Sequence, residues 1–275
     1  MRERGSASEG GGPDEGEVAS ERRGTGPLPL KPPLDDGSGL LRALRALRPV
    51  VEGADPRPAS VGPGLALGLG LAAVTEPGLG PAGPVEERLC AALPSGRSLE
   101  FLAGRRALRR ALGRAGLPVA GEIPYQADGV RPELPPGSVG SLSHSGGVAV
   151  ALAAPAARCA ALGVDLERHP LPLSAARVVL GGDEQLLPHG ELEGRERLLR
   201  ELFSAKESAF KALYGLLPPP RRPTTLRGIA VRPVPGGWTA WARGCPERVL
   251  HVNARWAVGA VLTWTVTDRP PDGTG

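Results

Sequence analysis

Carboxylates and lysines occur in two short segments whose spacing could bind a metal ion and phosphate groups. In the first, GVDLE, Asp165 and Glu167 lie two residues apart on a predicted strand, so both side chains leave the same face. Like charges this close are tolerated in solvent or when a cation holds both, and such hard oxygen ligands suit Mg²⁺. Taken alone, the pair is more often a solvated strand end.

The second segment, FSAKESAFK, places Glu207 between Lys206 and Lys211, two of only three lysines in a chain rich in arginine. On a helix Lys206 lies about 100° to one side of Glu207 and Lys211 about 40° to the other. Lys carries a compact charge on a flexible stem, whereas Arg is a planar fork. The retained lysines are therefore consistent with chemistry that needs an ammonium, and an ordinary ion pair on an amphipathic helix is the alternative.

The segment SLSHS supplies a hydroxyl and an imidazole, Ser143 and His144, beside a glycine pair. Neighbouring side chains of a strand point to opposite faces, so a Ser-His catalytic couple is not expected. Both groups can donate to phosphate oxygens, which favours a phosphate contact. The alternative is a packed or exposed loop histidine.

The composition favours one folded region behind a long tail. Residues 1–38 are rich in Gly, Glu, Ser and Pro and are predicted to be disordered. A net charge of +4 suits an anionic ligand or an acidic protein partner. The three cysteines have no metal-binding spacing, and the N-terminus has no secretory pattern, so we expect a reduced protein in the cytoplasm. The apolar run 65–74 is too short to span a membrane and is predicted to be a buried strand.

Hydrophobic periodicity predicts the elements that position these segments. Helices are expected from Leu40 to just before Pro49 and over 86–116, 176–188 and 194–217. Strands are expected within 141–154, 159–169, 226–244 and 248–266, with the strand at 159–169 paired to the one before it and a hairpin near 235–237. Strands and helices alternate in both halves, which indicates an α+β fold of two similar lobes.

Four motifs together resemble a known family. In order along the chain they are FLAGRRALRRAL, SLSHS, GVDLE and FSAKESAFKALY. Their order and spacing are similar to those of the 4′-phosphopantetheinyl transferase superfamily, in the branch typified by the enterobactin synthetase transferase. The resemblance covers about residues 65–266. It implies two similar α/β lobes related by a pseudo-two-fold axis, at 39–157 and 158–268, with a flexible end at 269–275.

The resemblance also implies the reaction. The enzyme would move the 4′-phosphopantetheine arm of coenzyme A to a serine of an apo acyl or peptidyl carrier protein and release adenosine 3′,5′-bisphosphate. Mg²⁺ would be required, with Mn²⁺ as a substitute. Coenzyme A and the carrier would be its partners, without nucleic acid or membrane, and the protein would act as a monomer.

By motif position, the resemblance assigns the site residues. Asp165, Glu167 and Glu207 would be the metal ligands, and Glu207 would also accept the proton of the carrier serine, directly or through water. Lys206 and Lys211 would contact the pyrophosphate. The remaining assignments, around the adenosine and its 3′-phosphate, are Ser143, His144, Arg105 and Arg131, with Arg97 as a weaker candidate.

Two other functions fit parts of the sequence. A metal-dependent phosphoanhydride hydrolase would use the same acids and lysines with water as the nucleophile. A nucleic-acid-binding module would rely on the arginine-rich helix at 105–114, but the sequence has no groove-reading motif. Modification of a carrier protein distinguishes the transferase from both.

Overall fold

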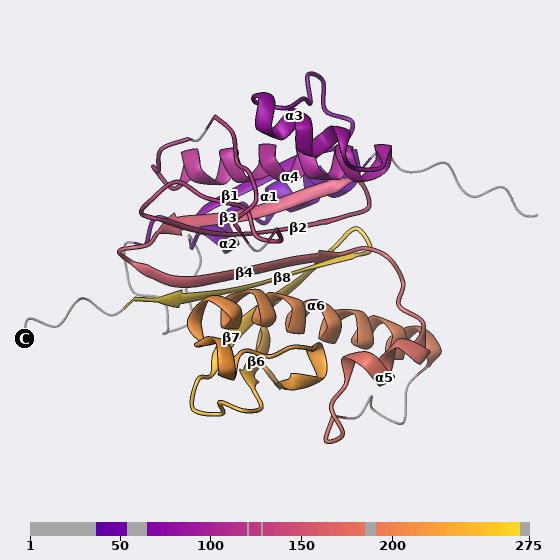
Figure 1. Cartoon of the computed structure of the whole chain (residues 1–275). Helices are drawn as coiled ribbons and strands as arrows, with labels where there is room; N and C mark the ends of the chain where they lie inside the picture. The colour runs from indigo at the N-terminus through magenta and orange to yellow at the C-terminus, as the bar shows by residue number, and fades with distance from the viewer. Residues whose placement is uncertain (1–36, 54–64, 120, 128, 185–190, 270–275) are drawn as a thin grey trace, which may run out of the picture. The chain divides into compact units, whose positions relative to one another are not determined.

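Two antiparallel sheets with packed helices make up the part of the chain that the computed structural model describes, which is residues 37–53, 65–119, 121–127, 129–184 and 191–269 (Figure 1). The mixed architecture confirms the α+β class. Most of the predicted N-terminal tail lies outside these ranges, as do residues 270–275, so both predictions about the chain ends stay predictions.

The first sheet has the strand order β1-β3-β2, with β1 at Gly68–Ala73, β3 at Val148–Pro155 and β2 at Ser138–Ser145. The sequence predicted a single strand where β2 and β3 form a hairpin. Gly146 and Gly147 make the turn with φ of 57° and 76°, which glycine adopts without strain. The strand prediction is corrected accordingly.

The long helix α4 (Ser95–Arg114) covers one face of this sheet. It approaches β1 so closely that a Cβ at Gly70 would overlap the carbonyl oxygen of Ala107. A single helix was predicted over 86–116, but α3 (Pro84–Ala91) is separate. Pro94 has extended backbone and precedes α4, since a proline cannot continue the hydrogen bonds of a preceding helix.

The second sheet has the order β4-β8-β7-β6-β5, all antiparallel. Its strands are β4 (Cys159–Glu167), β5 (Ile229–Val234), β6 (Gly237–Ala242), β7 (Leu250–Ala257) and β8 (Ala260–Asp268). The predicted hairpin between β5 and β6 is confirmed, with Gly236 at φ 82°. The predicted pairing of β4 with the preceding strand is wrong, because β4 forms its ladder with β8, about a hundred residues later in the chain.

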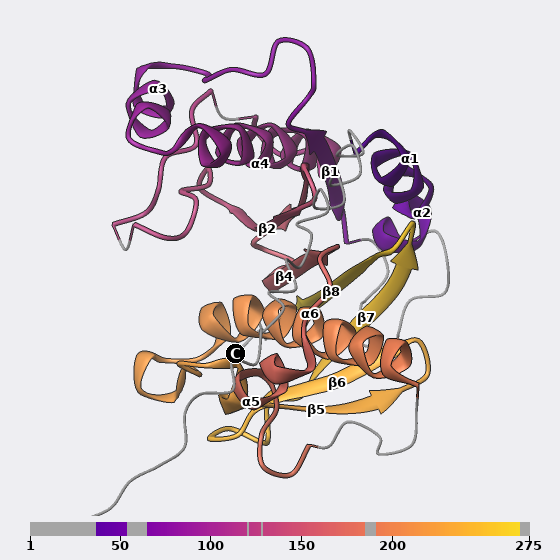
Figure 2. The same cartoon turned by 90° about the vertical axis from the view of Figure 1, so that its right-hand side faces the viewer.

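The helix α6 (Leu192–Leu216) lies along the second sheet and contacts all five of its strands (Figure 2). It confirms the helix predicted over 194–217. Small residues bring it close to β4, and a Cβ at Gly163 would overlap the carbonyl oxygen of Ser208. A hydroxyl also joins α6 to the neighbouring strand β8: Ser208 Oγ donates to the carbonyl oxygen of Thr263 at 3.0 Å. This close approach holds the motif helix beside the acid pair of β4.

One hydrophobic cluster joins the two sheets. It contains buried residues of β1 and β3, such as Leu69 and Val150, together with Val164 of β4 and Leu262 of β8. The contacts group residues 35–275 into one unit. The lobe boundary at 157/158 falls between β3 and β4, and the division into two lobes stays a prediction.

Shorter helices complete the described chain. The first predicted helix is α1 (Ser38–Ala46), which ends before Pro49 as expected, and α2 (Arg48–Glu52) follows with that proline in its first turn. Of the helix predicted over 176–188, only α5 (Ala176–Val179) forms in the described part, because two glycines follow it. Three 3₁₀ turns occupy Leu173–Ala175, Pro219–Arg221 and Leu226–Gly228. No helix in the described ranges has the length and apolar character needed to cross a membrane.

Candidate active site

Asp165 lies at the end of β4 and is nearly buried, with 5% of its surface exposed. Its Oδ1 accepts hydrogen bonds from Ser143 Oγ at 2.8 Å and from Lys211 Nζ at 2.9 Å. Its Oδ2 is buried and has no hydrogen-bond partner among the described residues. A buried carboxylate oxygen without a partner is costly, so this atom marks a place where a cation would be stabilising.

Glu167 stands two residues further along the strand, as the sequence predicted. Its Oε1 accepts hydrogen bonds from Ser145 Oγ at 3.0 Å and from the backbone N–H of His169 at 2.8 Å. Glu167 and Asp165 both line a small pocket of about 280 Å³. The spacing therefore brings both acids to one cavity.

Glu207 reaches the same pocket from α6. Burial raises the pKa of Glu207; the ammonium of Lys211 opposes this, and the carboxylates of Asp165 and Glu167 raise it further. The three acids thus share one electrostatic environment, which a divalent cation would relieve.

The carboxylates do not by themselves enclose a metal ion. Across the residues with a described position, no three His, Cys, Asp or Glu side chains form a group that could hold one. Mg²⁺ usually keeps several waters and takes one or two carboxylates plus substrate phosphates, so an incomplete protein shell is compatible with it. Together with the unpartnered Oδ2 of Asp165, the donor set fits such an ion.

Lys211 occupies the point between the acids and the larger cavity. Its ammonium donates to the carbonyl oxygen of Val164 at 3.0 Å and to Asp165 Oδ1 at 2.9 Å. It lines both the small pocket and a larger one of about 820 Å³. The side chain is therefore fixed where the two cavities meet.

Lys206 is not part of this site, and the predicted contact with a pyrophosphate is corrected here. Its side chain is 0% exposed, and its ammonium donates to Glu184 Oε2 at 2.5 Å. It also donates to the carbonyl oxygens of Val179 at 2.9 Å and Ile229 at 2.8 Å. Lys206 lies about 100° around the helix from its neighbour Glu207, and this angle places it on the face that packs on β5 and not in the pocket.

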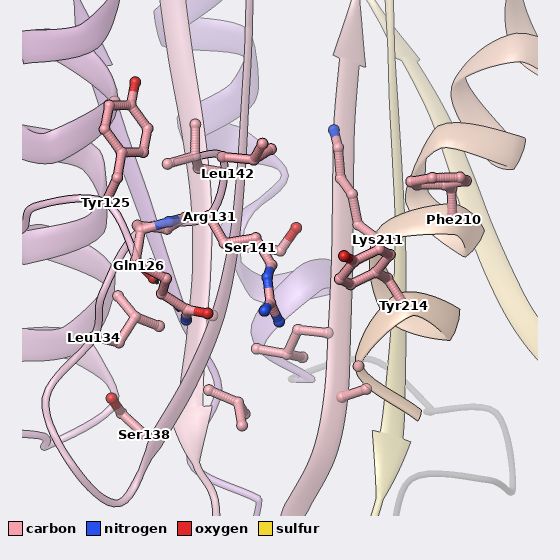
Figure 3. Close-up of a pocket in the computed structure, with 18 of the residues that line it drawn as sticks. Tyr125, Gln126, Arg131, Leu134, Ser138, Ser141, Leu142, Phe210, Lys211 and Tyr214 are labelled. Carbon is pink, nitrogen blue, oxygen red and sulfur yellow. Dashed lines mark hydrogen bonds between the residues drawn. The ribbon is translucent and has the colours of Figure 1, made fainter. Parts of the chain in front are cut away.

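The larger pocket lies between the two sheets. Figure 3 shows Tyr125, Gln126 and Arg131 on one side, and Phe210, Lys211 and Tyr214 of α6 on the other. Its lining combines charged side chains with aliphatic and aromatic ones, which suits a ligand with both charged and apolar parts.

Two of the predicted arginines line this pocket. Arg105 contacts the rings of both Phe101 and Tyr125, and its Nε donates to the carbonyl oxygen of Ile123 at 2.5 Å. Its Nη2 is buried and has no hydrogen-bond partner among the residues described. Arg131 stacks on the ring of Tyr214, with 4.9 Å from Cζ to the ring centroid. Sequence analysis missed these aromatic supports. Phe101 lies one turn before Arg105 on α4, whereas Tyr125 and Tyr214 come from segments distant from the arginines that they contact.

His144 lines both pockets, as its predicted role requires. Burial lowers the pKa of His144, although the nearby Glu100, 3.7 Å away, works in the opposite direction. Arg97 instead pairs with Glu100 at 2.9 Å, its side chain is 64% exposed, and it lines neither pocket. The structure therefore brings His144 to the site and leaves Arg97 outside it.

Comparisons with known proteins define the class. Residues 85–154 match the model of the 4′-phosphopantetheinyl transferase N-terminal domain, and residues 161–233 match the model of the 4′-phosphopantetheinyl transferase superfamily. The chain belongs to the 4′-phosphopantetheinyl transferase superfamily and is a transferase.

A particular relative carries the same assignment. Over 192 residues the chain is 34% identical to the 4′-phosphopantetheinyl transferase Svp of Streptomyces mobaraensis. The match covers 64% of this chain and 74% of the relative. The matched family regions include the segments SLSHS, GVDLE and FSAKESAFK, which carry the site.

Proposed function

We propose that this transferase moves the 4′-phosphopantetheine arm of coenzyme A to a serine of an apo acyl or peptidyl carrier protein, with Mg²⁺ or Mn²⁺. The observation that carries the proposal is the meeting of Asp165, Glu167, Glu207 and Lys211 in one small pocket that adjoins a larger one. Acids that can hold a metal and a cation that can hold phosphate are what transfer of a phosphate-linked arm needs.

Coenzyme A would lie along the larger pocket with its pyrophosphate at Lys211. The buried Nη2 of Arg105 and the ring of His144 supply donors for the adenosine end and its 3′-phosphate, and Arg131 lines the same pocket where it stacks on Tyr214 of α6. Ser143 was assigned to the same group, but its hydroxyl donates to Asp165. We therefore place Ser143 with the acids instead of with the donor.

Asp165, Glu167 and Glu207 would hold the metal, which, when bound, neutralises charge on the pyrophosphate oxygens. Asp165 would use its buried Oδ2, because Oδ1 is already occupied by Ser143 and Lys211. Lys211 adds a fixed positive charge at the same oxygens. Such preorganised charges stabilise the transition state without further rearrangement.

The reaction replaces a phosphoanhydride bond of the pyrophosphate by a phosphodiester bond to the carrier serine. The carrier serine oxygen forms a bond to the phosphorus that bears the pantetheine arm. The bond from that phosphorus to the leaving phosphate breaks, and adenosine 3′,5′-bisphosphate departs. Glu207 would take the proton of the serine hydroxyl, directly or through water. Burial raises the pKa of Glu207, whereas Lys211 and the metal, when bound, would lower it.

Several finer assignments belong to the proposal. We place the chain in the branch typified by the enterobactin synthetase transferase, on the motifs described above. We also expect a monomer in the cytoplasm, in keeping with three cysteines that are unpaired.

Incubation with coenzyme A, Mg²⁺ and a panel of apo carrier proteins tests the function, with intact-mass measurement of each carrier. We expect at least one carrier to gain the mass of the phosphopantetheine arm, and adenosine 3′,5′-bisphosphate to form in equal amount. Breakdown of coenzyme A without modification of any carrier would indicate the hydrolase instead.

A further inference from the structure

The strands β2 and β4 run side by side although they belong to different sheets. Hydroxyls at every second residue of β2 connect them. Ser141 Oγ accepts a hydrogen bond from the backbone N–H of Val164 at 3.0 Å, Ser143 Oγ donates to Asp165, and Ser145 Oγ donates to Glu167. Because the partner numbers rise together, the two strands point in the same direction. We call these three serines the serine seam.

The serine seam holds one oxygen of each acid. Ser143 engages Oδ1 of Asp165 and leaves Oδ2 buried without a partner among the described residues. Ser145 Oγ and the backbone N–H of His169 both donate to Oε1 of Glu167, so neither of these two hydrogen bonds uses Oε2. In both carboxylates, a serine of β2 therefore holds one oxygen by a hydrogen bond.

The hydroxyl of Ser145 has little freedom to do anything else. It accepts a hydrogen bond from the backbone N–H of Arg168 at 3.0 Å, so its single proton is directed at an acceptor. Glu167 Oε1 lies at 3.0 Å and His169 Nδ1 at 3.2 Å. Ser145 is 5% exposed and lines neither pocket, so it acts through Glu167 and does not touch the substrate.

We propose that Ser145 is a positioning residue, whose hydroxyl fixes the Glu167 carboxylate in the orientation that binds the metal. The inference rests on the proposed function, because it presumes that Glu167 is a metal ligand. Groups that orient a metal ligand from behind typically change metal affinity or activity about 10- to 100-fold when they are removed. In the sequence Ser145 is only the last residue of the SLSHS motif, and no local pattern predicts its contact with Glu167.

The test measures metal binding apart from turnover. MnCl₂ is titrated into the full-length protein with coenzyme A present, and free Mn²⁺ is counted by electron paramagnetic resonance. We expect Ser145→Ala to weaken Mn²⁺ binding about tenfold and to raise the Mg²⁺ concentration for half-maximal transfer by a similar factor. Ser145→Thr, which keeps the hydroxyl, should recover most of the affinity.

Ser204→Ala is the matched control, because it removes a buried serine contact of the same length, to Thr263 Oγ1, that involves no carboxylate, and Ser204 lines neither pocket. This control variant should bind Mn²⁺ as tightly as the wild-type protein does, even if its midpoint of thermal unfolding is lower. If Ser145→Ala does not fold, Ser145→Cys takes its place, since a thiol is a weak donor of similar size.

Three results would overturn the inference: unchanged Mn²⁺ affinity in folded Ser145→Ala, an equal loss in Ser204→Ala, or no Mn²⁺ binding by the unchanged protein. The proposed function is contradicted by a different measurement, in which no carrier gains the phosphopantetheine arm after incubation with the wild-type protein. The Mn²⁺ titration does not depend on a carrier, so the two failures are distinguishable.

Discussion

Lys211 and Lys206 lie five residues apart on one helix and perform different tasks. Lys211 donates to Asp165 at the junction of the two pockets, whereas Lys206 is enclosed by Glu184 and backbone carbonyl oxygens. Sequence spacing could place Glu207 and Lys211 together, about 40° apart on the helix. It could not say which flank of α6 is buried, because that depends on β5, which follows later in the chain.

Replacing Lys211 by alanine should lower transfer about 100-fold or more, because a preorganised cation at the pyrophosphate is removed. Lys211→Arg should recover little, since the planar guanidinium cannot take the place of an ammonium held by Val164 and Asp165. The measurement is the initial rate of carrier modification at saturating coenzyme A. Full recovery by arginine would contradict this explanation for the retained lysine.

Lys206→Met tests the structural role assigned to the other lysine. Removing Lys206 from the buried ion pair leaves Glu184 with the longer ion pair to Arg243, at 3.4 Å, and we expect the free energy of unfolding to fall by about 3 kcal/mol. Urea unfolding measures this loss. The structural role would be contradicted if the unfolding midpoint did not change. It would also be contradicted if the variant were stable and only its binding of coenzyme A were impaired, because Lys206 would then belong to the active site.

At the scale of elements, the approach of α6 to β4 positions the chemistry. Gly163→Ala would force a methyl group against the carbonyl oxygen of Ser208 and push the helix away from the strand. Overpacking of this kind typically costs about 1–3 kcal/mol, and we expect transfer to fall further than stability, because Glu207 and Lys211 move with α6.

Gly194→Ala serves as the control for that prediction, since a Cβ at this exposed position of the same helix meets nothing within 4 Å. It should be neutral or slightly stabilising, as alanine favours helices over glycine. Unfolding curves and transfer rates of both variants provide the comparison. If Gly163→Ala matches Gly194→Ala in both, the close approach has no role.

A buried carboxylate ties α3 to α4 and gives a prediction about pH. Glu86 accepts hydrogen bonds from Arg109 at 2.7 Å and from the backbone N–H groups of Ala82 and Ile123, both at 2.9 Å. Burial acts to raise the pKa of Glu86, but these partners outweigh it and the pKa is lowered. A lowered pKa means that the stabilisation is present above the ordinary value of 4.5 and is lost as the pH falls below it.

Glu86→Gln should therefore reduce the free energy of unfolding by about 2 kcal/mol at pH 7, and the difference should shrink below pH 4.5. Glu87→Gln, next to it and exposed, is the control and should change little. Urea unfolding at a series of pH values measures both. A difference that stays constant down to pH 3 would contradict the assignment.

Local patterns predicted the helices α4 and α6 and placed both acids on one face of a strand. They failed where distant segments meet. The pairing of β4 with β8 is set by residues about a hundred positions apart, and Ser145 gains its importance only because β2 runs beside β4. The aromatic support of Arg105 likewise combines α4 with a separate loop. Such contacts follow from the tertiary fold and leave no local periodicity.

At the scale of the whole molecule, the site is a junction between two sheets that share one hydrophobic core. The first sheet and its helix contribute Arg105, Ser143 and His144, and the second contributes the acids and Lys211. Neither sheet alone contains the complete set. The shared core and the serine seam together fix the distance across which coenzyme A would bind.

A crystal of the full-length protein grown with coenzyme A and Mn²⁺ tests the central claim most directly, through the anomalous scattering of manganese. We expect one strong peak within about 2.3 Å of carboxylate oxygens from Asp165, Glu167 and Glu207 and of pyrophosphate oxygens, with Lys211 beside the same phosphate. No peak at these acids when coenzyme A is bound, or a pyrophosphate held away from them, would contradict the account.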